Sequence, residues 1–382
     1  MKRIVVLGST GSVGQNALKV IASLGEKFRV VGLSAYSNVS TLLRQVRQFK
    51  PKWICLVDEL CAKRAKARLP SSCRLLSGRG GLQDLIQESN ADSVVLAVSG
   101  AEALMPLFKA VAMKKTVILA NKEALVIAGS IIMPLAARYG VRILPVDSEQ
   151  SAIWQCLEKR DKNQLRRVYL TASGGPFKNY NSEQLKGISI SDVLRHPRWN
   201  MGKRITVDSA TLMNKGLEII EAMWLFDLDL SQIKVIIHPE AVIHSMVEFI
   251  DGVILAQLSV TDMRIPIQYA LTYPQREATT LKPLNFFKLR KLNFQKPDLR
   301  RFPCLRLAIE AAAEGGSLPC VLNAADEMAV NAFLNKRIKF TDIPTIIAKV
   351  LNRHRKIAKP SLEEILAVDD WARAEARKIM EN

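Results

Sequence analysis

The first 150 residues alternate short apolar segments with helical patterns, and this alternation constrains the fold more than any other feature of the chain. Strands that alternate with helices form a parallel sheet with helices on both faces. The sequence therefore predicts an α/β fold that begins with a doubly wound, Rossmann-like domain. Its predicted strands are Arg3–Gly8, Arg29–Ala35, Trp53–Asp58, Ser93–Val98, Thr116–Ala120 and Arg142–Asp147.

A glycine-rich turn, GSTGSVG from Gly8 to Gly14, follows the first predicted strand and leads into a helix predicted from Ser12 to Leu24. Glycines let a phosphate approach the backbone, and a helix N-terminus offers N–H groups and a favourable dipole. The spacing is GxxGxxG rather than the commoner GxGxxG, and its position after an opening strand favours a dinucleotide. The second strand ends in Tyr36-Ser37-Asn38 without the acid that NAD enzymes use, so we predict NADP(H).

Polar and acidic residues follow two later strands of the predicted sheet. Asn121-Lys122-Glu123 comes after the fifth strand, and Asp147-Ser148-Glu149 comes after the sixth. Two carboxylates at one strand end suit a hard divalent cation, although surface acids often have the same spacing. We predict that Lys122 holds a substrate oxygen and that Asn121 and Glu123 line the cofactor.

The stretch from Leu194 to Ala222 combines basic, aromatic, hydroxyl and acidic residues. Its Pro-broken part, Arg195–Trp199, predicts a loop that closes over a ligand. Asp208–Thr211 predicts the start of a helix. One face of that helix then carries Asn214, Lys215, Glu218 and Glu221. This face is either solvated or supplies a third carboxylate to the strand-end acids.

The pattern changes after Asp147. Further predicted strands and a hairpin signal at Asp251-Gly252 indicate a central α/β domain with a mixed sheet. A stretch rich in Lys, Arg, Asn and Pro then leads to Ala-rich helices. The predicted division is 1–149 for NADPH binding, 150–274 for the catalytic domain with metal, substrate and lid, 275–304 for a linker, and 305–382 for a C-terminal helical domain.

The net charge of +19 raises the question of a nucleic-acid partner. The basic residues are spread along the chain, however, and no nucleic-acid-binding motif occurs, so we predict an anionic small ligand and no nucleic acid. The longest apolar run, Leu125–Ala137, is too short to span a membrane, and the N-terminus lacks a signal-peptide pattern. Six cysteines without metal-ligand spacing indicate reduced thiols in a cytoplasmic protein.

Five motifs, in one order along the chain, resemble the 1-deoxy-D-xylulose 5-phosphate reductoisomerases. They are Gly8–Gly14, Asn121–Glu123, Pro145–Glu149, Ser173–Phe177 and Arg195–Glu221, and the resemblance covers the chain from end to end. It implies a homodimer that uses NADPH and Mg²⁺, Mn²⁺ or Co²⁺. Such an enzyme rearranges a small phosphorylated sugar, 1-deoxy-D-xylulose 5-phosphate, and reduces the aldehyde to 2-C-methyl-D-erythritol 4-phosphate on the non-mevalonate route to isoprenoids.

The resemblance also implies roles for single residues. The metal ligands would be Asp147, Glu149 and Glu218, and the metal would act as a Lewis acid on substrate oxygens. The catalytic residues would be Lys122, Glu149 and His196, with Trp199 and Met201 on the same lid as His196 and no ligand role for Glu221. Substrate would be bound by Lys122, Ser148, Glu149, Ser173, His196, Ser209, Asn214, Lys215 and Glu218. The cofactor would be bound by Thr10, Gly11, Ser12, Val13, Asn38, Asn121, Glu123 and Gly202.

Two positions depart from the pattern of this family. Many relatives have Gly-Lys-Asn in place of Tyr36-Ser37-Asn38, so the lysine that would meet the 2′-phosphate of NADPH is missing. Gln150 replaces a histidine of many relatives, which changes a polar contact beside the metal ligands. Two other functions remain open: a metal-dependent NADPH oxidoreductase that reduces a phosphorylated aldehyde without rearrangement, and a non-catalytic protein that binds NADP(H) or nucleic acid.

Overall fold

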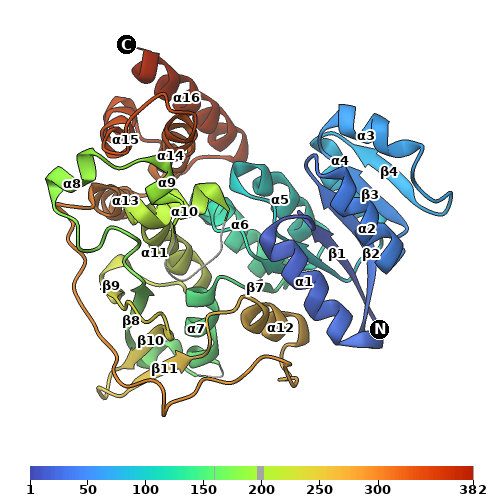
Figure 1. The fold of residues 1–382 in the computed structure, drawn as a ribbon, viewed down its shortest axis with the longest axis horizontal. Helices are drawn as coiled ribbons and strands as arrows, with labels where there is room; N and C mark the ends of the chain where they lie inside the picture. The colour runs from blue at the N-terminus through green and yellow to red at the C-terminus, as the bar shows by residue number, and fades with distance from the viewer. Residues whose placement is uncertain (159, 196–201, 382) are drawn as a thin grey trace. The chain divides into compact units, whose positions relative to one another are not determined.

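The computed structural model describes residues 1–158, 160–195 and 202–381, and it contains two compact units that are described separately here (Figure 1). Both units are assembled from segments that are distant in the sequence. The first unit consists of Met1–Ala124, Ile132–Ser148 and Asp262–Thr280. The second unit consists of Leu125–Ile131, Glu149–Thr261 and Leu281–Asn382.

The first unit contains a seven-stranded parallel sheet in the order β4-β3-β2-β1-β5-β6-β7. Its strands are β1 (Lys2–Leu7), β2 (Phe28–Ala35), β3 (Trp53–Leu56), β4 (Arg74–Ser77), β5 (Ser93–Leu96), β6 (Thr116–Leu119) and β7 (Ile143–Pro145). Central strands such as β1 and β5 are buried apolar runs, which is typical of a sheet covered on both faces. The predicted doubly wound, Rossmann-like fold is confirmed, with β4 as a strand that the sequence did not predict.

Helices connect these strands and cover the sheet (Figure 1). Helix α12, far along the chain, packs against α1, β6 and β7 and so completes the first unit. The helices are α1 (Ser12–Ser23), α2 (Val39–Phe49), α3 (Glu59–Lys66), α4 (Gly80–Glu88), α5 (Leu104–Ala112), α6 (Glu123–Tyr139), which extends into the second unit, and α12 (Arg264–Thr272).

The strand order reverses at β1, whose neighbours are β2 on one side and β5 on the other. Successive crossovers run outward from β1 to β4, and the chain then returns to β5. In open parallel sheets, ligands bind beyond the carboxyl ends of the strands at this reversal. The topology therefore places the residues after β1, β2, β5 and β6 at the expected cofactor edge.

The second unit contains a mixed four-stranded sheet in the order β11-β10-β8-β9, as predicted. Strands β8 (Leu165–Ala172) and β9 (Ile233–Ile237) are parallel, whereas β10 (Ile243–Phe249) pairs antiparallel with β8 and β11 (Ile254–Leu258). One face of this sheet packs on α7 (Ser148–Leu157) and α11 (Met213–Phe226) through a core that includes Ile153, Val168, Ile219 and Val247. Short helices α8 (Ser182–Lys186) and α9 (Ile190–Val193) precede α10 (Lys203–Thr211).

The predicted helix start at Asp208–Thr211 is wrong, because these residues form the last turn of α10. Leu212 then adopts a left-handed conformation with φ of 60°, and α11 starts at Met213. Asp208 does not cap a helix, because its carboxylate faces Arg204 one turn earlier, 3.7 Å from that residue's Nε. The break between α10 and α11 therefore occurs at a leucine in the left-handed conformation. Leucine rarely adopts this conformation, so the sequence alone does not predict the break.

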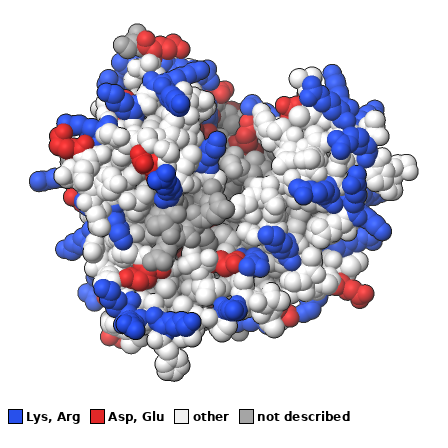
Figure 2. Space-filling model, in the orientation of Figure 1, with Lys and Arg blue, Asp and Glu red and all other residues white. Residues whose placement is uncertain are grey.

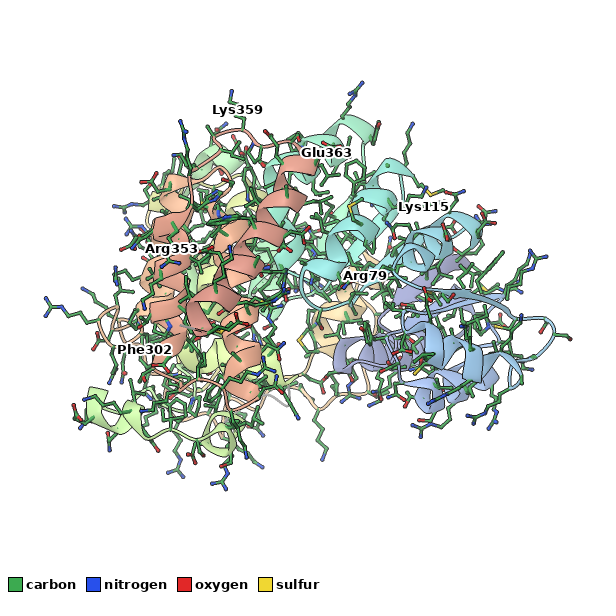
Figure 3. All side chains as sticks on the ribbon, turned by 90° about the horizontal axis from the view of Figure 1, so that it is seen from above. Arg79, Lys115, Phe302, Arg353, Lys359 and Glu363 are labelled. Carbon is green, nitrogen blue, oxygen red and sulfur yellow. The ribbon has the colours of Figure 1, made fainter. Side chains whose placement is uncertain are left out.

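The C-terminal part is helical, as predicted, and its described residues form α13 (Pro303–Glu314), α14 (Leu318–Leu334), α15 (Asp342–Arg353) and α16 (Leu362–Glu381). Figure 3 shows these helices side by side, and α14 contacts each of the other three. Helix α13 also packs on α11, where a side chain in place of Gly216 would overlap the Ala308 methyl group. Among the described residues, no helix is long and apolar enough to cross a membrane.

Candidate active site

The glycine-rich turn between β1 and α1 forms an open helix N-terminus. Gly11 is the N-cap of α1. Because glycine has no side chain, it does not cap the first N–H groups of the helix. Gly8 has φ of 74°, and a Cβ at Gly8 would overlap the Ala97 carbonyl oxygen. A Cβ at Gly14 would overlap the Gly8 carbonyl. These close approaches require glycine. The Gly11 N–H donates to the Gly8 carbonyl at 3.1 Å within the turn, and the N-terminus of α1, from Ser12 onward, lies at the cofactor edge, which fits a dinucleotide diphosphate.

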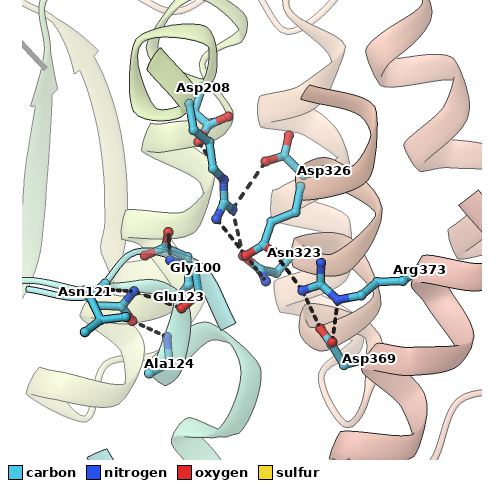
Figure 4. Close-up of polar contacts among 12 residues, drawn as sticks. Gly100, Asn121, Glu123, Ala124, Asp208, Asn323, Asp326, Asp369 and Arg373 are labelled. Atoms are coloured by element: carbon cyan, nitrogen blue, oxygen red, sulfur yellow. Dashed lines mark hydrogen bonds and ion pairs between the residues drawn. The ribbon is translucent and has the colours of Figure 1, made fainter. Parts of the chain in front are cut away.

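Asn121 and Glu123 organise the turn that follows β5 at the same edge (Figure 4). The Asn121 amide donates to the carbonyls of Val98 (3.0 Å) and Gly100 (3.1 Å), and its Oδ1 accepts from Ala124 N–H at 2.8 Å. Glu123 Oε1 accepts from the Gly100 N–H at 3.1 Å. These predicted cofactor residues therefore fix the β5 turn where the strand order reverses. Asn38, another predicted cofactor residue, caps α2 by accepting from Thr41 N–H at 3.1 Å.

Three carboxylates converge where β7 gives way to α7. One oxygen from each of Asp147, Glu149 and Glu218 lies within 4.8 Å of the other two. Asp147 and Glu149 flank Ser148 in the chain, and Glu218 projects from α11 with no exposed surface. A donor set made only of carboxylate oxygens fits a hard divalent cation such as Mg²⁺ or Mn²⁺.

Lys215 lies between two of these carboxylates and is itself 3% exposed. Its Nζ donates to Glu149 Oε1 at 2.8 Å and to Glu218 Oε2. Burial alone lowers the pKa of Lys215, but the charges of Glu149 and Glu218 outweigh burial, so its pKa is raised and it stays charged. Asn214 donates to the other oxygen of Glu218 at 2.6 Å. The polar face of α11 is therefore buried and paired, and the solvated alternative is wrong.

Lys122 forms a second lysine–carboxylate pair within the first unit. Its Nζ lies 2.5 Å from Asp147 Oδ2, and its side chain is 6% exposed. A buried ammonium is costly unless a carboxylate pairs with it, so this lysine is held in place after β6. The ion pair therefore holds the ammonium group of Lys122 in a fixed position beside Asp147.

The turn after β8 lies against α10. Gly174 and Gly175 have φ of 85° and 66°, and Ser173 Oγ accepts from Gly175 N–H at 3.4 Å. A Cβ at Gly175 would lie 2.8 Å from the Ser209 carbonyl oxygen, so the backbone of this turn touches α10 at Ser209. The turn that carries Ser173 therefore lies against the helix that carries Ser209, and these are two predicted phosphate-binding residues from segments 36 residues apart.

Two buried side chains in the second unit border the carboxylates. Gln150 donates to the Glu218 carbonyl oxygen at 2.9 Å, so the residue that replaces a histidine still contacts the helix that carries Glu218. His244 on β10 has its pKa lowered mainly by burial and raised in part by Glu149. Sequence reasoning missed His244, because a lone histidine in a strand looks like an ordinary sheet residue.

Helix α10 is tied to the C-terminal bundle by a charged network (Figure 4). Arg204 donates to Glu327 Oε1 at 2.6 Å and to Asn323 Oδ1 at 3.2 Å, both on α14. Its guanidinium also lies 3.8 Å from Asp326 Oδ2. Arg373 of α16 continues the network, 2.7 Å from Glu327 Oε2. The network holds α10, the helix that carries Ser209, to α14 and α16.

The predicted lid residues His196, Trp199 and Met201 lie outside the described residues, so their placement is not part of this site. Gly202 is described and forms the N-cap of α10. Ser148 is buried at the first position of α7. On the face shown in Figure 2, Lys and Arg side chains are dispersed among uncharged surface rather than gathered in one stripe.

Three family models match successive parts of the chain. The model described as 1-deoxy-D-xylulose 5-phosphate reductoisomerase matches residues 4–129. The model for its C-terminal domain matches residues 143–226, and one described as DXP reductoisomerase C-terminal domain matches residues 258–375. Together they cover most of the chain.

Curated relatives and solved structures agree over the whole length. The chain is 48% identical to 1-deoxy-D-xylulose 5-phosphate reductoisomerase of Caldanaerobacter subterraneus over 97% of each chain. It is 49% identical to that of Desulforamulus reducens over 100% of each. It is also similar to the Zymomonas mobilis enzyme solved with NADPH (TM-score 0.93, 40% identity, 100% and 99% covered). A reductoisomerase solved with NADPH, fosmidomycin and magnesium gives a TM-score of 0.93 at 38% identity, covering 100% and 98%.

Proposed function

This chain belongs to the 1-deoxy-D-xylulose 5-phosphate reductoisomerase family, and we propose that it carries out the family's reaction with the residues described above. It is an NADPH-dependent enzyme with a divalent metal. The reaction rearranges the carbon skeleton of 1-deoxy-D-xylulose 5-phosphate and reduces the resulting aldehyde to 2-C-methyl-D-erythritol 4-phosphate. The observation that carries the proposal is the group of three carboxylates with Lys215 between two of them.

Asp147, Glu149 and Glu218 are the residues that would hold the metal. When bound, the metal supplies a Lewis acid that polarises the substrate's carbonyl and hydroxyl oxygens. The chain's own part includes fixing Glu218: Gln150 donates to its backbone carbonyl, and Asn214 donates to its side chain. Lys122, paired with Asp147, would place a positive charge beside a substrate oxygen that becomes negative during rearrangement.

The substrate phosphate would be bound by hydroxyl, amide and ammonium groups of the second unit. Ser173 lies in the glycine turn that touches α10 at Ser209, and Asn214 and Lys215 follow on α11. Binding a phosphate far from the reacting carbons supplies energy for orienting them. Ser148 and His196 complete the proposed substrate contacts, and Lys122, Glu149 and His196 are the proposed catalytic residues.

NADPH would bind at the carboxyl edge of the parallel sheet. The N-terminus of α1, at Thr10, Gly11, Ser12 and Val13, would receive the diphosphate. Asn38, Asn121, Glu123 and Gly202 are the other proposed cofactor residues. The proposed domains are those predicted from the sequence: an NADPH-binding domain at 1–149, which also ends in the metal ligands Asp147 and Glu149, a catalytic domain with the lid at 150–274, a linker at 275–304 and a helical domain at 305–382.

The proposed function is tested by mixing the purified protein with 1-deoxy-D-xylulose 5-phosphate, NADPH and Mg²⁺, with and without a chelator. We expect NADPH oxidation that the chelator stops and a branched methyl-erythritol phosphate as product. NADPH oxidation with an unbranched product would leave the fold and cofactor assignments intact but refute the rearrangement. No oxidation with Mg²⁺, Mn²⁺ or Co²⁺ would refute the catalytic assignment.

The proposed assembly is a homodimer in the cytoplasm. Exposed apolar side chains support an interface on the second unit. Ile250 (66% exposed) and Val253 lie in the turn between β10 and β11, and Ile254 is the first residue of the edge strand β11. Phe286 and Phe287 are adjacent exposed residues in the linker. The six cysteines are free, which suits a reducing compartment. Light scattering should give about twice the 42.5 kDa chain mass, and Ile254→Lys should shift it toward one chain.

A further inference from the structure

A groove of about 260 Å³ lies between α1 and α2 in the first unit. Both helices connect neighbouring strands in the same direction, β1 to β2 and β2 to β3, so right-handed crossovers place them on one face of the sheet (Figure 1). The walls of the groove include Gln15 and Lys19 from α1, and Thr41, Arg44 and Gln45 from α2.

Hydrogen bonds join both walls of the groove to the glycine-rich turn. Gln45 Oε1 accepts from Ser9 Oγ at 2.7 Å, and its Nε2 donates to the Ser9 carbonyl at 2.8 Å. Gln15 Nε2 donates to the Thr10 carbonyl at 2.8 Å. The groove is therefore built against the turn that we assign to the cofactor, beside the end of β2, where dinucleotide-binding folds hold the adenosine ribose.

The positive charge of Arg44 lies where the dipole of its own helix disfavours a cation. Its Nη2 donates to Thr41 Oγ1 at 3.1 Å, which turns the guanidinium back toward the N-terminus of α2. Helix N-termini favour anions, and a cation there is disfavoured. Among the residues that the structure describes, no carboxylate forms an ion pair with Arg44. An anion bound at this position would satisfy both the guanidinium and the helix dipole.

Lys19 is the second cation of the groove, but an acid lies near it. Asp262 has its pKa lowered chiefly by its hydrogen bond with Arg264, and Lys19 adds to that effect. Part of the Lys19 charge is therefore balanced by Asp262. Arg44 is the better candidate for binding an external anion.

We propose that Arg44 binds the 2′-phosphate of NADPH in this groove and sets the preference for NADPH over NADH. The inference rests on the proposed function. It accounts for the missing lysine at Ser37, because the positive charge comes from the second turn of α2 instead of from the residues that follow β2. Arginine suits this role, since its planar donors bind phosphate oxygens in pairs.

The test measures the binding of NADPH, NADH, 2′,5′-ADP and 5′-AMP to the wild type, Arg44→Gln and Arg47→Gln by calorimetry. Arg47 is the matched control, because it is an exposed arginine on the same helix that does not line the groove. Arg44→Gln should weaken NADPH and 2′,5′-ADP about 10- to 100-fold, which is the usual effect of losing a hydrogen bond to a charged group. NADH and 5′-AMP should bind as in the wild type, and Arg47→Gln should change none of the four.

Unchanged NADPH affinity in Arg44→Gln would overturn the assignment and leave the proposed NADPH use intact. Equal affinity of the wild type for NADPH and NADH would instead overturn the selectivity itself, and with it the cofactor part of the proposed function. An equal loss of NADPH and NADH affinity would mean that Arg44 shapes the turn rather than reads the phosphate. Partial recovery of NADPH affinity in Arg44→Lys would support charge recognition.

Discussion

Replacing Glu218 by glutamine should lower turnover about 10³-fold while leaving NADPH affinity unchanged. A bound metal ion contributes several kcal/mol to the stabilisation of developing charge, and each 1.36 kcal/mol changes a rate tenfold, so loss of a metal ligand should lower the rate strongly. Glu218 is fully buried and has both oxygens engaged, one with Asn214 and one with Lys215. The neutral amide of the variant has nearly the same shape but cannot supply the negative charge.

The measurement combines steady-state kinetics with Mn²⁺ titration by calorimetry, so that metal binding is read independently of turnover. Glu221→Gln is the matched control, because Glu221 is a buried acid on the same helix outside the three-carboxylate group. We expect Glu218→Gln alone to weaken Mn²⁺ binding. If its Mn²⁺ affinity and activity equal those of the wild type, Glu218 is not a metal ligand.

Replacing Arg204 by alanine should destabilise the second unit by about 3–5 kcal/mol, the usual cost of removing one partner from a buried ion pair. Three acids would lose this cation: Asp208 and Asp326, which are 3% and 0% exposed, and Glu327, which would keep Arg373. The pKa of Asp326 is already raised well above its usual value, mainly by burial and then by Asp208, and Arg204 opposes that rise.

The destabilisation should grow with pH. A carboxyl group whose pKa is raised in the folded state takes up a proton on folding, so its favourable contribution is complete at low pH and is lost as pH rises through the folded-state pKa. Without Arg204 the pKa of Asp326 rises further. The variant and the wild type therefore differ in protonation only above the wild-type folded-state pKa of Asp326, and the loss of stability in Arg204→Ala should grow as pH rises past that value. The loss of stability is measured by comparing the urea unfolding midpoints of Arg204→Ala and the wild type at pH 5 and at pH 8.

Arg306→Ala is the control for Arg204→Ala, because the Arg306–Glu310 pair has similar chemistry on an exposed helix surface. Its midpoint should stay near that of the wild type at both pH values. The role assigned to the network would be contradicted if the urea midpoint of Arg204→Ala fell no further than that of Arg306→Ala. It would also be contradicted if the fall became smaller as pH rises.

The sequence was sufficient to predict the architecture of the parallel sheet, because its strands are apolar runs separated by helical patterns. It did not predict β4, whose four residues are half-buried or exposed and so lack an apolar signature. The same limit applied to the α10–α11 break at Leu212, because only the packed structure favours a left-handed leucine there. Local pattern is informative where burial follows the period of the element, and tertiary packing decides the rest.

The site was predictable in its residue types but not in its electrostatics. The acids after β7 and on α11 could be picked out from their spacing, yet the sequence could not show that α11 buries Lys215 between Glu149 and Glu218. An amphipathic pattern does not distinguish a solvated polar face from a buried, paired one. His244 was missed for a related reason, since its position near Glu149 depends on how β10 pairs with β8.

The return of α12 to the first unit has a consequence for synthesis on the ribosome. Helix α12 packs against α1, β6 and β7, but it is separated from β7 by more than a hundred residues of the second unit. During synthesis, the surface of the N-terminal sheet that α12 covers therefore stays exposed after the sheet itself has left the ribosome. It is covered only when Arg264–Thr272 has also left the exit tunnel. Because exposed apolar surface promotes aggregation of nascent chains, this interval is the period in which the growing polypeptide most needs chaperone protection.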